Sequence, residues 1–316
     1  VSVNLRALRC SFISFSVTYL FGMTTKIGKL YGRKRDNFTL AWYRYHKTGQ
    51  QMEIRFWKYE GAGNDFIILD GRDVGPLPDG QTVRRLCDCH RGVGADGLMV
   101  LGTEPSYDFG MTYYNADGSE AQMCGNGGRC IALFAYHMGV AGKEMLFLGR
   151  DGDHRGVVLS EDGGSAQVEI SMIPVENYEF GDGAFVLNTG VEHYVEFSEK
   201  IAAVDVERLG REIRESERFA YCGGVNVNFV QVDGPGEISV RTYERGVEAE
   251  TLACGTGAVA SAIAAHLYSQ SDCNDFLVHT RGGDLRVRFE TEDDQRFSAI
   301  RLSGPASRVF SGVIAL

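Results

Sequence analysis

Two cysteines in this chain lie in closely similar sequence contexts, one in each half. Cys124 occurs in NADGSEAQMCGNGGRC and Cys254 in ERGVEAETLACGTG. Each follows a polar loop after a strand-like run (109–114 and 238–243) and precedes an apolar, helix-like run (131–138 and 258–268). The pattern predicts a thiol at the start of each helix, where unpaired backbone N–H groups attract anions and favour a thiolate.

The repetition of strand, polar loop, Cys-Gly-x-Gly and helix indicates a duplicated fold that presents two thiols to one cleft. A carboxylate would fit between the two helix starts, with its neighbouring carbon between the sulfurs. One thiolate could remove a proton from that carbon while the opposite thiol returns one, which inverts the centre. The developing enolate-like charge would be held by both helix N-termini. Two such thiols titrate as a pair, and oxidation to a Cys124–Cys254 disulfide would abolish this function.

Length and composition favour a soluble protein of two ordinary domains. The chain has 316 residues, 44% of them hydrophobic and 23% charged, and contains no apolar run of the roughly 18 residues that a membrane span needs. Eight cysteines in a chain of this length do not indicate a disulfide scaffold, so we expect reduced thiols and a cytoplasmic protein.

The first 51 residues differ in charge from the rest of the chain. They contain nine Lys or Arg and one Asp, a net charge of +8. Because the whole chain carries −10, residues 52–316 carry −18. This segment could be a targeting sequence, a basic arm for nucleic acid, or upstream sequence outside the working fold. We favour the third, because a clear strand pattern begins after Met52, and the acidic body would repel phosphate. We therefore expect domains at 52–175 and 176–316.

Several other motifs do not predict a cofactor or metal site. Gly61-Ala62-Gly63 is followed by a second strand, not by a helix, so it does not predict a dinucleotide site. The Cys87-Asp88-Cys89-His90 sequence lacks a second ligand pair, and we predict no metal site. No phosphate loop or pyridoxal-type lysine motif is evident, so no cofactor is predicted.

Four polar residues could have either a structural or a functional role. Asn64 follows a glycine turn and could simply form it. His193 lies within a strand-like run, where a structural role is also reasonable. In the strand VNVNFVQV, alternation places Asn226 and Asn228 on one face, which is unfavourable in a core unless that face lines a polar site.

Together these motifs resemble the diaminopimelate epimerase family. The resemblance rests on GAGNDF, RGVGADG, the two cysteine segments and VNVNF, and it covers residues 52–316. It implies an α/β (α+β) fold of two pseudo-symmetric domains. Each is a mixed, largely antiparallel sheet wrapped around a central helix, and the active site lies in the cleft between them. It also implies cofactor-independent interconversion of LL- and meso-diaminopimelate in lysine and peptidoglycan precursor biosynthesis, by a homodimer.

The resemblance assigns roles to individual residues. Cys124 and Cys254 would be the acid and base, and the backbone at Gly125-Asn126 and Gly255-Thr256 would bind the reacting carboxylate. The other expected substrate contacts are Asn64 near the reacting end and Asn115, Asn226 and Arg245 at the distal end. Glu244 and His193 match supporting polar residues beside the thiols.

Two positions depart from the family pattern. Gly97 replaces a frequent Gln, and Val191-Glu192-His193 replaces a frequent Asn-Pro-His. At least one polar contact to substrate is therefore missing or is supplied elsewhere. The alternatives are a two-cysteine racemase of the proline or hydroxyproline type, and a non-catalytic amino-acid-binding or thiol-redox protein. A substrate with one carboxylate would not need Arg245 and the distal asparagines.

Overall fold

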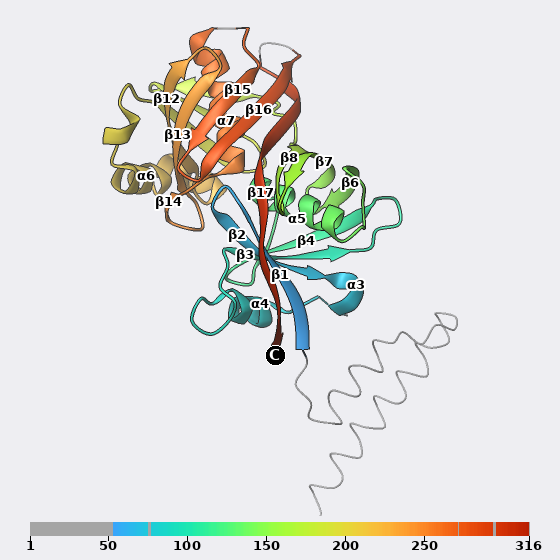
Figure 1. The fold of residues 1–316 in the computed structure, drawn as a ribbon. Coiled ribbons are helices and arrows are strands. Elements are labelled where there is room, and N and C mark those ends of the chain that lie inside the picture. The colour runs from blue at the N-terminus through green and yellow to red at the C-terminus, as the bar shows by residue number, and fades with distance from the viewer. Residues whose placement is uncertain (1–52, 75–76, 271, 293–294, 316) are drawn as a thin grey trace, which may run out of the picture. The chain divides into compact units, whose positions relative to one another are not determined.

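The computed structural model describes residues 53–74, 77–270, 272–292 and 295–315. Glu53–Leu316 forms one compact unit, shown as a ribbon in Figure 1. The prediction about residues 1–51 falls outside the described residues. Within the described part of the chain, every helix is too short or too polar to cross a lipid bilayer.

The first half of this unit is a closed ring of strands around one helix. The ring contains β1 (Glu53–Gly61), β2 (Asn64–Asp70), β3 (Gly97–Gly102), β4 (Phe109–Asn115), β6 (Glu144–Gly149), β7 (Gly152–Asp162), β8 (Ser165–Ser171) and the last strand, β17 (Phe297–Ala315). The helix α5 (Gly125–His137) packs against six of these strands with a continuously buried run from Gly125 to Ala135. Short elements complete this half: α3 (Gly71–Val74), α4 (Gly80–Cys87) and β5 (Glu120–Ala121).

The second half also wraps strands around a central helix, α7 (Gly255–Ser269). Its strands are β9 (Tyr178–Gly181), β10 (Ala184–Asn188), β11 (Glu192–Phe197), β12 (Asn226–Gly234), β13 (Glu237–Glu244), β14 (Ala249–Thr251), β15 (Asp275–Thr280) and β16 (Gly283–Thr291). The helix α6 (Val206–Arg214) and the 3₁₀ turns η1 (Ile201–Ala203) and η2 (Glu217–Cys222) lie in the connection between β11 and β12. Most strand pairs are antiparallel, while β2–β3, β4–β6, β11–β12 and β13–β15 are parallel.

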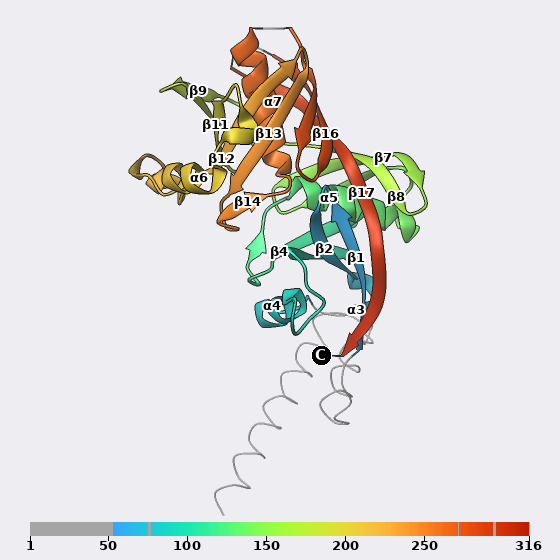
Figure 2. The same ribbon diagram turned by 60° about the vertical axis from the view of Figure 1, so that its left-hand side comes forward.

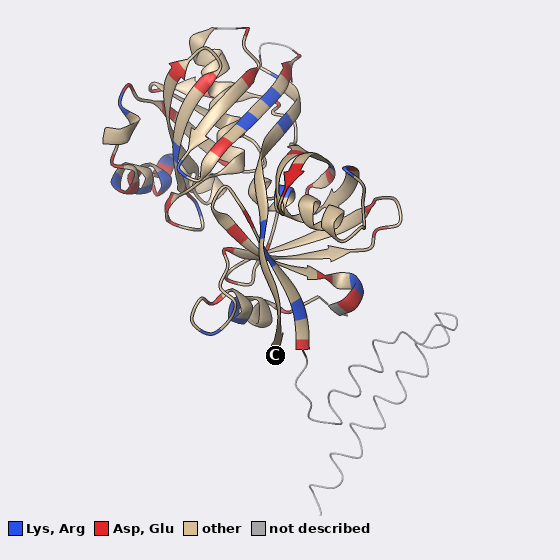
Figure 3. Cartoon of the chain, in the orientation of Figure 1, with Lys and Arg blue, Asp and Glu red and all other residues tan. Residues whose placement is uncertain are grey.

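Composition explains which helix is central and which is peripheral. α7 reads GTGAVASAIAAHLYS and contains no Asp, Glu, Lys or Arg, as expected for a helix that is apolar on all sides and surrounded by strands. By contrast, α6 reads VERLGREIR and carries both signs of charge, visible in Figure 3. Its buried positions are Val206 and Gly210, so one side packs on the sheet while the rest faces solvent.

β17 belongs to both halves. Its first residues pair with β16, whereas Gly304–Ser307 pair with β8, and the end of the strand pairs with β1. Figures 1 and 2 show this strand running from one group of strands to the other. The structure thus has the predicted fold class, a mixed and largely antiparallel sheet around a central helix in each half. The division of the chain at residues 175 and 176 remains a prediction.

Candidate active site

The two central helices meet at their N-termini. A Cβ atom added to Gly255 would lie 3.1 Å from the Cα of Gly125, and one added to Gly125 would lie 3.2 Å from the Cα of Gly255. The Leu302 side chain closes the contact from β17, at 2.8 and 3.0 Å from the two added atoms. Side chains at either position would force the helices apart, so both glycines are required for this close approach.

Cys124 is the N-cap residue of α5, and an ordered amide faces its sulfur. Its Sγ lies 3.7 Å from Oδ1 of Asn64. The Asn64 amide is held by Asp96, whose Oδ2 accepts from Asn64 Nδ2 at 2.6 Å. Asn64 Oδ1 also accepts from Asn126 Nδ2 at 3.4 Å. The sequence left the role of Asn64 open between turn-former and site residue, and the structure places its side chain at the first thiol.

Cys254 holds the equivalent position on α7. Its Sγ accepts from the Gly257 backbone N–H at 3.4 Å and lies 3.4 Å from Oγ1 of Thr256. Both cysteines are free thiols. The predicted placement of each cysteine immediately before a helix is therefore confirmed.

The acidity of the two thiols differs from the expectation of a helix-stabilised thiolate. Burial raises the pKa of Cys124 to about 11, although the N–H of Gly127 lowers it. Burial also raises the pKa of Cys254 well above its usual range, and the Glu244 carboxylate adds to this effect. Desolvation thus outweighs the helix N-terminus in the ligand-free site, and both thiols are protonated near neutral pH.

Glu244 is the ionisable group that couples to both thiols. It closes β13 beside the cavity, and burial raises its pKa to about 7. Its negative charge raises the pKa of Cys124 and of Cys254. A bound cation that neutralised Glu244 would therefore make both thiols easier to ionise.

A cavity of about 430 Å³ lies in front of the two helix N-termini, and residues of both halves line it. Ten of the predicted site residues are among its lining: Asn115, Cys124, Gly125, Asn126, Asn226, Glu244, Arg245, Cys254, Gly255 and Thr256. Val191, at one of the positions that depart from the family pattern, lines it as well. The volume is that of a site for a small molecule.

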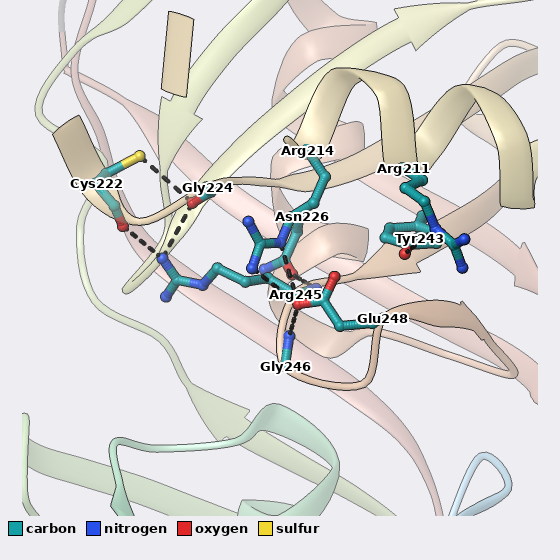
Figure 4. Close-up of polar contacts among 9 residues, drawn as sticks. All are labelled: Arg211, Arg214, Cys222, Gly224, Asn226, Tyr243, Arg245, Gly246 and Glu248. Carbon is teal, nitrogen blue, oxygen red and sulfur yellow. Dashed lines mark hydrogen bonds and ion pairs between the residues drawn. The ribbon is translucent and has the colours of Figure 1, made fainter. Parts of the chain in front are cut away.

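Arg245 is held in place by backbone carbonyl groups (Figure 4). Its Nη1 donates to the carbonyl oxygens of Cys222 and Gly224 at 2.9 and 3.1 Å, and its backbone N–H donates to Asn226 Oδ1 at 2.8 Å. Among the described residues, no carboxylate pairs with this guanidinium. An ordered cation at the rim of a cavity is suited to bind a carboxylate in a bidentate manner.

His193 lies behind the cavity wall and does not line the cavity. It is fully buried, and burial lowers its pKa to about 3, so the imidazole is neutral. Nδ2 of Asn228 lies 3.0 Å from His193 Nδ1, and Nδ2 of Asn226 lies 3.5 Å from Nε2. The Asn228 amide is fixed further by Thr242 Oγ1 at 2.9 Å. The two inward-facing asparagines of the VNVNF strand thus support a polar layer behind the site.

Arg129 was missed by the sequence reasoning, although it lies inside the first cysteine motif. It is fully buried, and it donates to the carbonyl oxygen of Gly125 at 3.2 Å and to Asn126 Oδ1 at 2.9 Å. Asn126 Nδ2 in turn donates to the carbonyl of Ala253, the residue before Cys254, at 2.9 Å. This chain of hydrogen bonds connects the two cysteine turns, and only the fold brings its members together.

Comparisons with known proteins identify the family of this chain. The family model described as diaminopimelate epimerase matches residues 56–175 and 185–309. A protein named diaminopimelate epimerase from Flavobacterium psychrophilum is 40% identical over 262 residues, which cover 83% of this chain and 100% of the relative. The protein of that name from Aquifex aeolicus is 40% identical over 275 residues, covering 82% of this chain and 97% of the relative.

Solved structures with a similar fold are more distant in sequence. A PhzF-family phenazine biosynthesis protein from Bacillus anthracis superposes with a TM-score of 0.66 at 13% identity, covering 84% of this chain and 100% of the other. A hydroxyproline epimerase from Agrobacterium vitis, with bound trans-4-hydroxy-L-proline, superposes with a TM-score of 0.63 at 15% identity, covering 84% and 94%. These likenesses concern the fold alone. The family model and the curated relatives go further, and with both cysteine turns facing one cavity they place this chain in the diaminopimelate epimerase family.

Proposed function

We propose that this protein epimerises LL-2,6-diaminopimelate to the meso isomer without pyridoxal phosphate, in the biosynthesis of lysine and peptidoglycan precursors. One observation carries the proposal. The N-termini of two helices, each directly preceded by a cysteine, meet at one cavity that Arg245 also lines. Membership of the family and relatives at 40% identity named for this activity support it.

The reacting carboxylate would bind at the paired helix N-termini. Gly125, Asn126, Gly255 and Thr256 line the cavity, and the backbone N–H groups of these two turns would hold the carboxylate and the enolate-like charge that develops on it. The α-carbon would then lie between the sulfurs of Cys124 and Cys254.

The proton would move between the two faces of the α-carbon. The thiolate of one cysteine takes the α-proton and becomes a thiol, while the opposite thiol donates its proton and becomes the thiolate, so no net proton is consumed. Because both thiols are protonated in the free site, one must ionise after binding. The substrate ammonium beside the reacting carbon would pair with Glu244 and offset the negative charge that opposes ionisation.

Arg245 would bind the distal carboxylate, with Asn115 and Asn226 at the same end of the substrate. This assignment distinguishes diaminopimelate from proline-type substrates, which have one carboxylate and no distal amino-acid group. The likeness to a hydroxyproline epimerase structure concerns the fold at 15% identity and does not favour that substrate.

Proton exchange tests the proposal directly. The reduced, full-length protein is incubated in D₂O with LL-diaminopimelate and without pyridoxal phosphate, and α-deuterium is followed by NMR. Deuterium that appears together with the meso isomer supports two-base epimerisation. The absence of exchange and of isomer interconversion would sink the proposal, and L-proline and hydroxyproline would be tested next.

Assembly and location stay predictions. We expect a homodimer in the cytoplasm, and sedimentation of the purified protein measures the first of these.

A further inference from the structure

Tyr113 is a cavity-lining residue to which the sequence assigned no role. It lies on β4, two positions before Asn115, so the two side chains project from the same face of the strand. Both residues line the cavity together with Cys124 and Glu244. A phenol at this position is within the part of the site where the proposed substrate would bind.

The phenol ring occupies the space beside Gly97. Gly97 lies on the neighbouring strand β3 and pairs with Asn115. A Cβ atom added to Gly97 would lie 2.6 Å from Cε2 of Tyr113 and 3.1 Å from its hydroxyl oxygen. The ring therefore lies directly over the glycine, and no side chain at position 97 could share that space. This packing explains why residue 97 is glycine when Tyr113 is present.

The Tyr113 hydroxyl makes no hydrogen bond to any residue that the structure describes. The ring itself is fixed by an edge-on contact with Phe66, at 6.0 Å between the ring centroids. Burial raises the pKa of Tyr113 well above its usual range, and the nearby Cys124 and Glu244 add to the shift. The group is therefore a neutral O–H donor at all physiological pH values. Tyr113 is half-buried in the cavity wall, so a bound ligand can supply the acceptor that the surrounding residues do not.

We propose that Tyr113 contacts the substrate directly, by donating a hydrogen bond from its hydroxyl to a carboxylate oxygen, and that it supplies the polar contact that Gly97 cannot make. The inference rests on the proposed function for the identity of the substrate. The structural support for the contact is the position of the phenol over Gly97, its place in the cavity wall and its unpartnered hydroxyl.

The test compares Tyr113→Phe with Tyr114→Phe in the full-length protein. Both variants lose one phenol oxygen from adjacent positions of the same strand. Tyr114 projects from the opposite face and packs in the cluster with Leu98 and Val83, away from the cavity. KM and kcat are measured with LL-diaminopimelate, and thermal unfolding is followed for each variant.

We expect Tyr113→Phe to raise KM about tenfold, which is the loss of one hydrogen bond to a charged group, with kcat within about twofold of the parent. Tyr114→Phe should change neither constant. An unchanged KM in Tyr113→Phe overturns the inference. So does a fall in kcat at constant KM, which would indicate a role in proton transfer, or an equal change in both variants.

Measuring binding separately from epimerisation distinguishes a failure of this inference from a failure of the proposed function. If the parent protein binds LL-diaminopimelate without epimerising it, the proposed function fails. Calorimetry then measures the dissociation constant, and Tyr113→Phe should still weaken it about tenfold. If the parent protein does not bind this compound, both proposals fail together.

Discussion

Gly125 and Gly255 face each other across the meeting point of the two halves, each at the first position of its central helix. A Cβ atom on Gly255 would lie 3.1 Å from the Cα of Gly125 and 3.0 Å from a methyl group of Leu302. This contact sets how close the two cysteine turns can come, because each cysteine immediately precedes its glycine.

Gly255→Ala should therefore reduce turnover more than it reduces stability. The added methyl group pushes the helix N-termini apart by a few tenths of an ångström, and a small misplacement of catalytic groups is costly. We expect kcat to fall at least about tenfold while the unfolding temperature drops by a few degrees. Gly181→Ala is the matched control, since a Cβ there would meet no heavy atom within 4 Å. Equal kcat values for the two variants would contradict this role of the glycine contact.

Replacing either thiol should abolish epimerisation. Cys124→Ala and Cys254→Ala each remove one of the two proton carriers, so we expect kcat to fall by at least about a hundredfold. The smaller side chains leave the fold intact, which circular dichroism and thermal unfolding check. Cys130→Ala serves as a control, because that buried thiol lies on the same helix but outside the cavity lining. Full activity in either catalytic variant would refute the two-thiol mechanism.

Glu244→Gln should lower the activity of the protein and raise its stability at alkaline pH. Since burial raises the folded-state pKa of Glu244 from 4.5 to about 7, the folded protein retains a proton there that the unfolded chain releases. Stability is therefore lost as pH rises from about 4.5 through 7, and the amide avoids this loss. We expect the variant to be about 3 kcal/mol more stable at pH 8 and equal to the parent near pH 4.

Denaturant unfolding at the two pH values measures this difference in stability, and steady-state kinetics measures the loss of activity. KM for diaminopimelate should rise in Glu244→Gln because the neutral amide cannot pair with the substrate ammonium. A stability difference that does not depend on pH would show that Glu244 has an ordinary pKa.

The turn that carries Arg245 is supported by an ion pair to α6, shown in Figure 4. Glu248, in left-handed conformation with φ of 59°, accepts from Gly246 N–H at 3.0 Å and from Arg214 Nη2 at 2.8 Å. Glu248→Gln should loosen the turn and raise KM about two- to fivefold with little change in kcat, because partly exposed pairs are modest in strength. Glu212→Gln, which breaks the exposed pair with Arg208 on the same helix, should leave KM unchanged.

Removal of residues 1–51 should leave kcat/KM for diaminopimelate within about twofold of the full-length value. The family match spans residues 56–175 and 185–309, and every residue of the candidate site lies within or between these ranges. Activity measurements on both proteins check this. A large loss in the shortened protein, with its unfolding temperature unchanged, would assign the segment a part in catalysis.

Much of the fold could be predicted because its signals are local. The alternation in VNVNFVQV predicts β12, and the small-residue apolar run after Cys254 predicts a helix, since period and composition depend only on neighbouring residues. Exact helix boundaries depend on capping contacts. The helix α4 spans Gly80–Cys87, because Asp79 caps it and Asp88 begins a turn by accepting from the His90 and Arg91 N–H groups.

The sequence by itself determined that two cysteines begin two equivalent helices, and its resemblance to a known family named most of the residues that line the cavity. Only the tertiary structure decided the acidity of the thiols, the route from Arg129 through Asn126 to Ala253, and the position of Tyr113 over Gly97. The reason is physical. Helix capping and alternation act between residues that are close in the chain, whereas desolvation, close backbone approach and an unpartnered hydroxyl depend on which distant segments fill the space around each group.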